Sequence, residues 1–208
     1  MTKGQTTRDA IVHEALAQAT RVGLEGLSLG VLADSLSLSK SGLFAHFKSK
    51  EALQRAVLEH AIELFAHHVV LPALAKPRGR PRLVALFHNV LAWKRGEATK
   101  HGCVFAQLSV EYDDQPGAIR DLLVESQLEL RRTIATCVEK AIAEGHFRSD
   151  VDPEQFAFDM LGITMSYGES YKLLGMTDAL ERAEQSFERL LENAAPAAAG
   201  STRRRPQA

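Results

Sequence analysis

Apolar residues recur along most of the chain at intervals of three and four, which is the spacing of one face of an α-helix. The clearest such face lies before Gly23 and consists of Ile11, Val12, Ala15, Leu16 and Ala19. No segment shows the sustained alternation of apolar and polar residues, rich in Val, Ile and Thr, that strands need. The pattern therefore predicts an all-α protein.

Capping residues predict where the N-terminal helices begin and end. We expect a first helix from Thr7 to Val22, capped by Thr6 or Thr7 and stopped by Gly23. Ser28 and Ser39 can each cap a very short helix, and Ser49 can cap a long one. The apolar residues of the two short helices are Leu29, Leu32, Ala33 and Leu36, and then Leu43, Phe44 and Phe47.

Proline and glycine divide the chain further. Residues 71–82 contain Pro72, Pro77, Gly79 and Pro81, which predict the end of the long helix and a loop into a second region. Beyond it we expect helices over residues 82–96, 101–112, 116–144, 153–174 and 177–193, with breaks at Gly102, Gly145 and Gly175. The predicted organisation is an N-terminal unit (1–60), a larger helical domain (61–193) and a disordered tail (194–208).

Two short helices only about three residues apart need support from neighbours, because helix nucleation is costly and each buries little surface. The first helix and the long fourth one can supply it around a shared core of Leu32, Leu36, Leu43, Phe44 and Phe47. This is the helix-turn-helix arrangement, which projects its second short helix into the major groove of DNA. The N-terminal unit is therefore predicted to bind DNA.

Polar residues on the second short helix suit that role. Ser39, Lys40 and Ser41 fall in its first turn, where side chains meet base edges, and His46, Lys48 and Lys50 follow. Lys50 also begins the next helix, where free amides and a cation can bind a phosphate. With Ser28, Leu43 and Phe44 these residues form the predicted DNA-binding set.

Bulk charge does not drive this binding. The whole chain carries a net charge of -1, and residues 1–60 hold seven basic and six acidic residues, so any DNA contact must be local. The two cysteines, Cys103 and Cys137, are expected to be reduced core thiols. The chain has no run of about 18 apolar residues and a polar start, so we expect a cytoplasmic protein that does not associate with membranes.

Residues 28–53, SLGVLADSLSLSKSGLFAHFKSKEAL, resemble the DNA-binding signature of the TetR family of transcriptional regulators, most specifically in FAHFKSKEAL. The resemblance covers roughly the first 60 residues. It implies that Lys40, Ser41 and Leu43 face the bases and that Phe44, His46 and Lys50 lie at the DNA backbone. Two positions depart from the family. Phe44 stands where Tyr is usual and loses a hydroxyl, and Ser37 stands where Gly is usual in the turn.

The larger domain is expected to hold a small-molecule effector and to form a homodimer. Its apolar residues are interrupted by polar groups that could orient a mostly apolar ligand, and the predicted ligand-binding residues are Trp93, Phe105, Gln107, Tyr167, Glu169 and Tyr171. The last two helices resemble in position the family's four-helix dimer interface. Gly162, Ser166, Ser170 and Leu173 could permit close approach of a second copy.

A helical metal-binding enzyme without a DNA role is the alternative prediction. His60, Glu63 and His67 share a helical face, with His68 beside it. The paired Glu-x-x-His motifs of a carboxylate-bridged metal site are absent, as are hydrolase triads and nucleotide-binding loops. We therefore expect no catalytic residue, no metal and no cofactor. The favoured function is a repressor released from a palindromic DNA operator by a small, mostly apolar effector.

Overall fold

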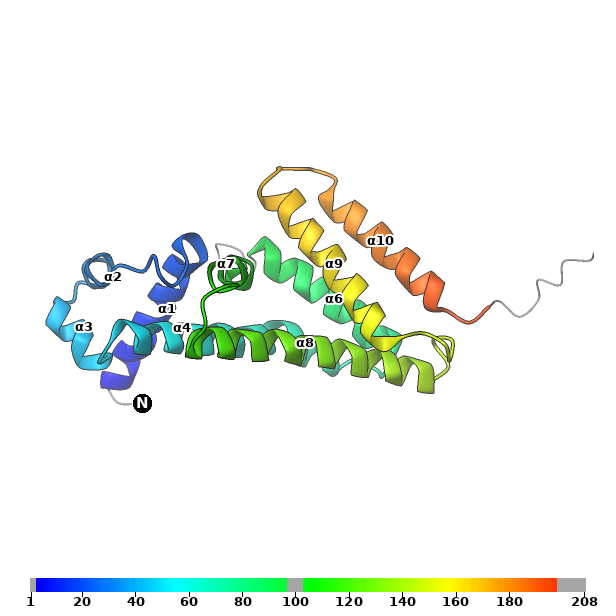
Figure 1. Ribbon diagram of the computed structural model, residues 1–208, viewed down its shortest axis with the longest axis horizontal. Coiled ribbons are helices and arrows are strands. Elements are labelled where there is room, and N and C mark those ends of the chain that lie inside the picture. The colour runs from blue at the N-terminus through cyan, green and yellow to red at the C-terminus, as the bar shows by residue number, and fades with distance from the viewer. Residues whose placement is uncertain (1–2, 97–102, 198–208) are drawn as a thin grey trace, which may run out of the picture.

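The computed structural model describes residues 3–96 and 103–197, and every regular element within these ranges is helical. Figure 1 shows an elongated molecule with the short helices at one end and the last two helices towards the other. The N-terminal elements are α1 (Lys3–Val22), α2 (Leu29–Ser35), α3 (Lys40–His46) and α4 (Lys50–Phe65). The all-α prediction, with a small helix-turn-helix unit before a larger helical domain, is confirmed.

Helix α1 begins earlier than predicted. It starts at Lys3, so Thr6 and Thr7 lie inside the helix and do not cap it. The helix includes Gly4, whose cost in a helix is only about 1 kcal/mol, and sequence patterns locate helix ends only to within a few residues. The C-terminal prediction is confirmed, because Gly23 has a φ of 75° and its N–H donates to the Ala19 carbonyl at 2.9 Å.

The three predicted serine caps are all present. The side-chain oxygens of Ser28, Ser39 and Ser49 accept the backbone N–H groups of Val31, Gly42 and Ala52, at 3.4, 3.0 and 3.1 Å respectively. Each cap satisfies a donor that the helix itself cannot pair. Between α2 and α3, Ser37 adopts a φ of 54°, the left-handed conformation that the turn was expected to impose.

The long helix does not end where it was predicted to end. It continues from α4 through a π-helical turn, η1 (Ala66–Val70), into α5 (Leu71–Leu74), so the first part of the expected 71–82 loop is helical. Pro72 sits in the first turn of α5, where its missing N–H is tolerated, directly after the wider π turn. The predicted division at residue 60 therefore falls inside an unbroken helix.

The larger domain consists of α6 (Arg80–Arg95), α7 (Val104–Glu111), α8 (Ala118–Ala143), α9 (Pro153–Lys172) and α10 (Ala179–Ala194). These helices match the predicted ones to within about three residues. The expected start of the 101–112 helix and the break at Gly102 lie outside the described residues. So does most of the predicted disordered tail, whose first residue, Ala194, ends α10.

A continuous apolar core links the two ends of the molecule. Near the N-terminus it is built from α1 and α4, and towards the C-terminus the Phe87 and Phe187 rings stack at 3.9 Å between α6 and α10. Cys103 and Cys137 are both free thiols, and burial raises the pKa of Cys137. One stretch, Lys50–Leu74, has the length and apolarity of a membrane span, but core helices of water-soluble proteins commonly meet the same criteria.

Candidate nucleic-acid interface

The helix-turn-helix is fixed in place by a small apolar core. Leu32 of α2, Leu43 in the middle of α3 and Phe47 directly after α3 are buried in the shared apolar core, and both short helices contact α1. The Arg8 guanidinium of α1 lies over the Phe47 ring, 4.9 Å from its centroid. The orientation of α3 is therefore set by packing against α1 and α2.

Two residues of the predicted core and site need correction. Leu43 is 1% exposed, so it belongs to the core and does not face the bases as the resemblance implied. Phe44 is 46% exposed and is not a core residue. Helical geometry gives the reason: Leu43 and Phe47 are four residues apart and share the inner face, whereas Phe44 is turned about 100° from Leu43. Phe44 remains a predicted DNA-backbone contact.

The first turn of α3 presents a polar, exposed surface. Ser39, Lys40 and Ser41 are all exposed, and the hydroxyl oxygens of Ser39 and Ser41 lie 3.0 Å apart. The Lys40 side chain passes Gly30 of α2, where an added Cβ would lie 3.4 Å from Lys40 Cε. The lysine stem therefore lies in van der Waals range of α2 at Gly30. Ser28, capping α2, is exposed as well.

The basic residues at the end of α3 and after it differ in their exposure and in their partners. Lys48 is exposed, and His46 is half-buried. Lys50, by contrast, donates to the backbone carbonyl of Glu25 and pairs with its carboxylate at 3.4 Å. Lys50 thus ties the start of α4 to the loop after α1, a role that its position after the Ser49 cap did not reveal.

The loop after α1 also contacts the larger domain, and this junction was missed by sequence reasoning. The Glu111 carboxylate accepts the backbone N–H groups of Leu24, at 2.9 Å, and Glu25. The Tyr112 hydroxyl donates to the Glu25 carboxylate at 3.1 Å. Burial and then this hydrogen bond raise the pKa of Tyr112 well above its ordinary value. The partners in these hydrogen bonds are 86 and 87 residues apart, so the spacing of nearby residues could not predict the contacts.

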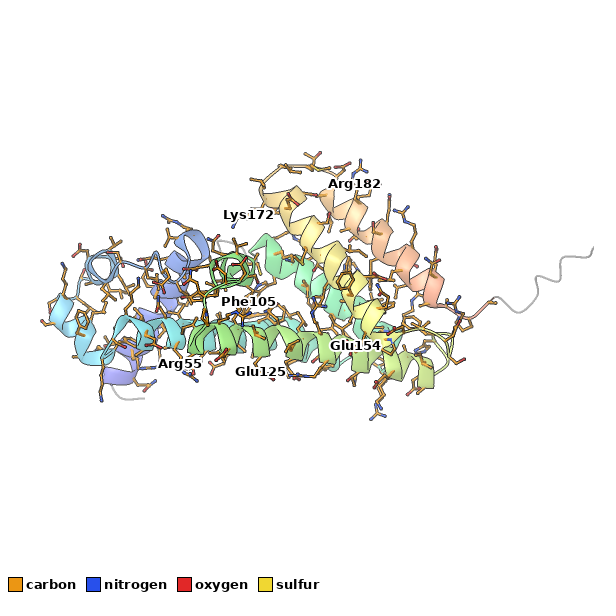
Figure 2. All side chains as sticks on the ribbon, viewed as in Figure 1. Arg55, Phe105, Glu125, Glu154, Lys172 and Arg182 are labelled. Carbon is orange, nitrogen blue, oxygen red and sulfur yellow. The ribbon has the colours of Figure 1, made fainter. Side chains whose placement is uncertain are left out.

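The predicted ligand-binding residues separate into three groups. Trp93 and Phe105 come together with Phe65 in an aromatic cluster, in which both rings meet Phe65 edge-on at 5.3 and 5.5 Å. Figure 2 shows Phe105 between α7 and the long helices beneath it. Tyr167 and Tyr171 stack at 5.7 Å on α9. Gln107 and Glu169 are exposed.

Two buried polar atoms stand out in this region. Within the described residues, neither Trp93 Nε1 nor Tyr167 Oη has a hydrogen-bond partner. An unpaired buried donor costs about 1–3 kcal/mol, so folded proteins rarely leave one. Both residues belong to the set predicted to orient a ligand, which remains a prediction.

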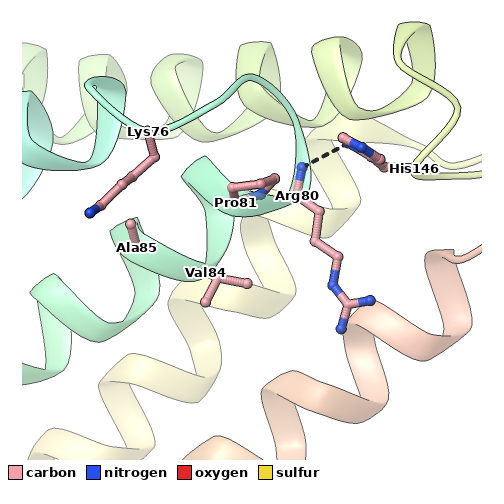
Figure 3. Close-up of a pocket in the computed structure, with 6 residues that line it drawn as sticks. All are labelled: Lys76, Arg80, Pro81, Val84, Ala85 and His146. Carbon is pink, nitrogen blue, oxygen red and sulfur yellow. Dashed lines mark hydrogen bonds between the residues drawn. The ribbon is translucent and has the colours of Figure 1, made fainter.

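Two pockets lie away from the predicted ligand-binding residues. One of about 440 Å³ opens beside the start of α6 and is lined by Lys76, Arg80, Pro81, Val84, Ala85 and His146 (Figure 3). A smaller one of about 190 Å³ lies between α7 and α8 and includes Tyr112 and Arg120 in its wall. Neither of these two pockets is lined by a predicted ligand-binding residue.

The histidine-rich face of α4 does not assemble a metal site in the described part of the chain. No group of three His, Cys, Asp or Glu side chains is placed to hold an ion there. His60 Nδ1 lies 3.9 Å from the Glu63 carboxylate, and burial lowers the pKa of His60. The alternative of a metal-binding enzyme gains no support from these residues.

Helix α9 carries exposed apolar residues, Phe158 and Met165, beside the predicted dimer residues Gly162, Ser166, Ser170 and Leu173. Phe158, Met165 and Leu173 are 61%, 67% and 76% exposed, and an added Cβ at Gly162 would meet nothing within 4 Å. Ser166 is exposed and Ser170 half-buried. Residues 158, 162, 165 and 173 recur at helical spacing, so they form one apolar stripe along the helix.

Comparison with known proteins supports this geometry. Residues 11–57 match the family "Bacterial regulatory proteins, tetR family", and residues 79–187 match "Tetracyclin repressor-like, C-terminal domain". The HTH-type transcriptional repressor KstR2 of Mycolicibacterium smegmatis is 28% identical over 152 residues, covering 70% of this chain and 69% of that protein.

Two solved structures show the same fold over nearly the whole chain. A TetR transcriptional regulator from Chloroflexus aurantiacus has a TM-score of 0.87 at 24% identity, covering 95% of this chain and 100% of that one. AibR, in complex with isovaleryl coenzyme A and operator DNA, has a TM-score of 0.72 at 22% identity, covering 90% of this chain and 98% of that one. Because the C-terminal family match alone spans half of the sequence, the chain belongs to the TetR family of DNA-binding transcriptional regulators.

Proposed function

We propose that this regulator is a cytoplasmic repressor that binds a palindromic operator as a homodimer and is released by a small, mostly apolar effector. The observation that carries the proposal is the exposed first turn of α3, with Ser39, Lys40 and Ser41 on a helix whose inner face is locked by Leu43 and Phe47. Such a turn can enter the major groove as a rigid unit. Lys40 and Ser41 would meet the bases.

Phosphate contacts would surround that turn. Lys48 and Phe44 are exposed on the same short segment, and the free amides at the start of α4 add a partial positive charge. Because Lys50 is engaged by Glu25, we assign the principal cationic phosphate contact to Lys48. Ser28, Ser39 and His46 complete the proposed DNA-facing set.

Dimerisation would pair the uncovered stripe of α9 with its copy. One helix-turn-helix reads only a few base pairs, so useful specificity needs two half-sites about one helical turn apart, or a multiple of that. An apolar stripe containing Phe158, Met165 and Leu173 is what a self-complementary interface requires. Gly162 would let the two backbones approach closely.

The effector would enter at the aromatic cluster of Phe65, Trp93 and Phe105. An occupant with a hydrogen-bond acceptor would satisfy Trp93 Nε1, and a further polar group would satisfy Tyr167 Oη. AibR, which shares this fold, is known in complex with isovaleryl coenzyme A and operator DNA, which supports the binding of both a small molecule and DNA. Gln107, Glu169 and Tyr171 stay secondary candidates because they are exposed.

Selection of bound fragments from random duplex DNA tests the proposal. We expect the purified protein to enrich a near-palindromic sequence with two half-sites. Lys40→Ala should then alter the preferred bases, whereas Lys48→Ala should weaken binding on all sequences and flatten the salt slope by about one. Lys140→Ala, an exposed lysine near the end of α8, is the matched control and should change neither. Failure to enrich any sequence would exclude sequence-specific regulation.

A further inference from the structure

The loop after α1 is shaped around a carboxylate from the larger domain. Glu111, the last residue of α7, accepts the backbone N–H groups of both Leu24 and Glu25. An added Cβ at Gly23 would collide with that carboxylate, so only glycine leaves room for it. Two charge-assisted hydrogen bonds therefore join α7 directly to the DNA-binding unit.

The same loop is held from its other side by α4. Gln54 donates to the Leu24 carbonyl at 3.0 Å and to the Glu25 carboxylate at 2.8 Å, and Lys50 binds Glu25 as well. The Tyr112 hydroxyl also donates a hydrogen bond to the Glu25 carboxylate. Donation from Gln54, followed by that from Tyr112 and the charge of Lys50, keeps the pKa of Glu25 below its ordinary value. We call Leu24, Glu25, Lys50, Gln54, Glu111 and Tyr112 the α7 junction.

Helix α7 connects this junction to the aromatic cluster. Phe105 lies near its start and Glu111 at its end, six residues apart, or about 9 Å along the axis. The Phe105 ring contacts Phe65 and Trp93. A short helix can move as a rigid piece, so a displacement of the α7 backbone at Phe105 would shift the contacts of Glu111. The contacts of α7 with α1 make it a bridge between the two parts of the molecule.

We infer that Glu111 and Tyr112 are positioning residues that couple the aromatic cluster to the DNA-binding helices through the α7 junction. The inference rests on the proposed function, because it supplies the route by which an effector would act. Coupling is reciprocal: if an occupant of the cluster alters DNA binding, DNA must alter the cluster. The junction can therefore be tested with DNA alone.

Trp93 provides the measurement. It is the only tryptophan in the sequence and is buried in the cluster, so its fluorescence reports on that site alone. The probe is the duplex selected by the wild-type protein, added until an anisotropy titration shows saturation. We expect a reproducible change in Trp93 emission for the wild type. Glu111→Gln should reduce this change by at least roughly twofold while the duplex still binds.

Two further variants make the test specific. Asp114→Asn removes the same charge from an exposed position three residues away and should keep the full Trp93 response. Tyr112→Phe keeps the buried ring but loses the hydroxyl bonded to Glu25, so it should reduce the response as Glu111→Gln does. Thermal unfolding of each variant shows whether it is folded.

The outcomes separate the two proposals. A wild-type protein that binds the duplex without any change in Trp93 emission overturns the junction and leaves the proposed function standing. Equal responses from Glu111→Gln, Tyr112→Phe and Asp114→Asn overturn it as well. Absence of duplex binding by the wild type overturns the proposed function itself, and the coupling with it.

Discussion

The helix-turn-helix unit and the larger domain satisfy their polar and apolar groups in different ways. In the first, serine side chains cap α2, α3 and α4 from within three residues, and the inner faces of the short helices are buried. In the second, Trp93 Nε1 and Tyr167 Oη have no partner within the described residues, and an apolar stripe on α9 faces outward. The N-terminal unit thus caps three of its helices with its own serine side chains, whereas the larger domain presents surfaces suited to a ligand and a second copy.

Leu43 provides the strongest test of the apolar core of the N-terminal unit. Leu43→Ala leaves a cavity among α1, α2 and α3 and should lower the free energy of unfolding by about 3 kcal/mol. Urea denaturation followed by circular dichroism measures the loss. Val31→Ala, at an exposed position of α2, should cost no more than about 0.5 kcal/mol. Equal losses in both variants would show that the unit has no specific core at Leu43.

The outward stripe of the larger domain is tested by placing a charge on it. Met165→Glu should weaken self-association at least about tenfold, equivalent to about 1.4 kcal/mol, because the carboxylate would be desolvated between two copies of α9. Sedimentation equilibrium at several concentrations measures it. Thr136→Glu, on the exposed surface of α8, is the control. A dimer of unchanged affinity in Met165→Glu would place the interface elsewhere.

The serine caps predict a smaller effect that separates folding from DNA binding. Ser39→Ala should reduce stability by about 1 kcal/mol, because the Gly42 N–H loses its partner. Ser39→Asp should restore stability, since aspartate caps equally well, yet it should weaken DNA binding by adding a negative charge at the proposed interface. Denaturation and duplex titration on the same samples measure the two effects. Recovery of both properties in Ser39→Asp would show that position 39 does not face DNA.

The smallest expected effect concerns the turn itself. Ser37→Gly should raise the free energy of unfolding by about 0.5 kcal/mol. Glycine adopts a φ near 54° without strain, and this gain exceeds the larger entropy that glycine loses on folding. A small upward shift of the urea midpoint with an unchanged slope would show it. Destabilisation would mean that the Ser37 side chain makes a contribution larger than its backbone strain.

Local sequence patterns predicted the N-terminal unit well and the binding surfaces less well. The caps at Ser28, Ser39 and Ser49 and the left-handed residues Gly23 and Ser37 depend on neighbours within four residues, so their consequences can be inferred from the chain itself. The inner face of α3 was harder to assign. Leu43 and Phe44 are adjacent apolar residues, and only packing against α1 and α2 shows which of them is buried.

Long-range contacts could not be predicted. Nothing near Lys50 in the sequence indicates that its ammonium group will bind Glu25. Nothing near Glu111 indicates that its carboxylate will accept the backbone N–H of Leu24. Among the expected ligand-binding residues, Trp93 and Phe105 meet because α6 and α7 both pack beside Phe65. Gln107 lies two residues from Phe105 on the same helix, so it is turned about 200° away from Phe105 and is exposed, which helical spacing alone could have indicated.

The π-helical turn of residues 66–70 has a geometric consequence for the whole regulator. A π turn holds one residue more than an α turn. The side chains that follow it along the helix therefore point in directions that are rotated from those of a continuous α-helix. Leu53 and Val57 are buried upstream of the π turn, and Val69 and Ala73 are buried within it and downstream. Deleting a single residue there would turn the following part of the helix by about 100° relative to the part before it. The extra residue therefore sets the rotation of the N-terminal unit relative to the larger domain.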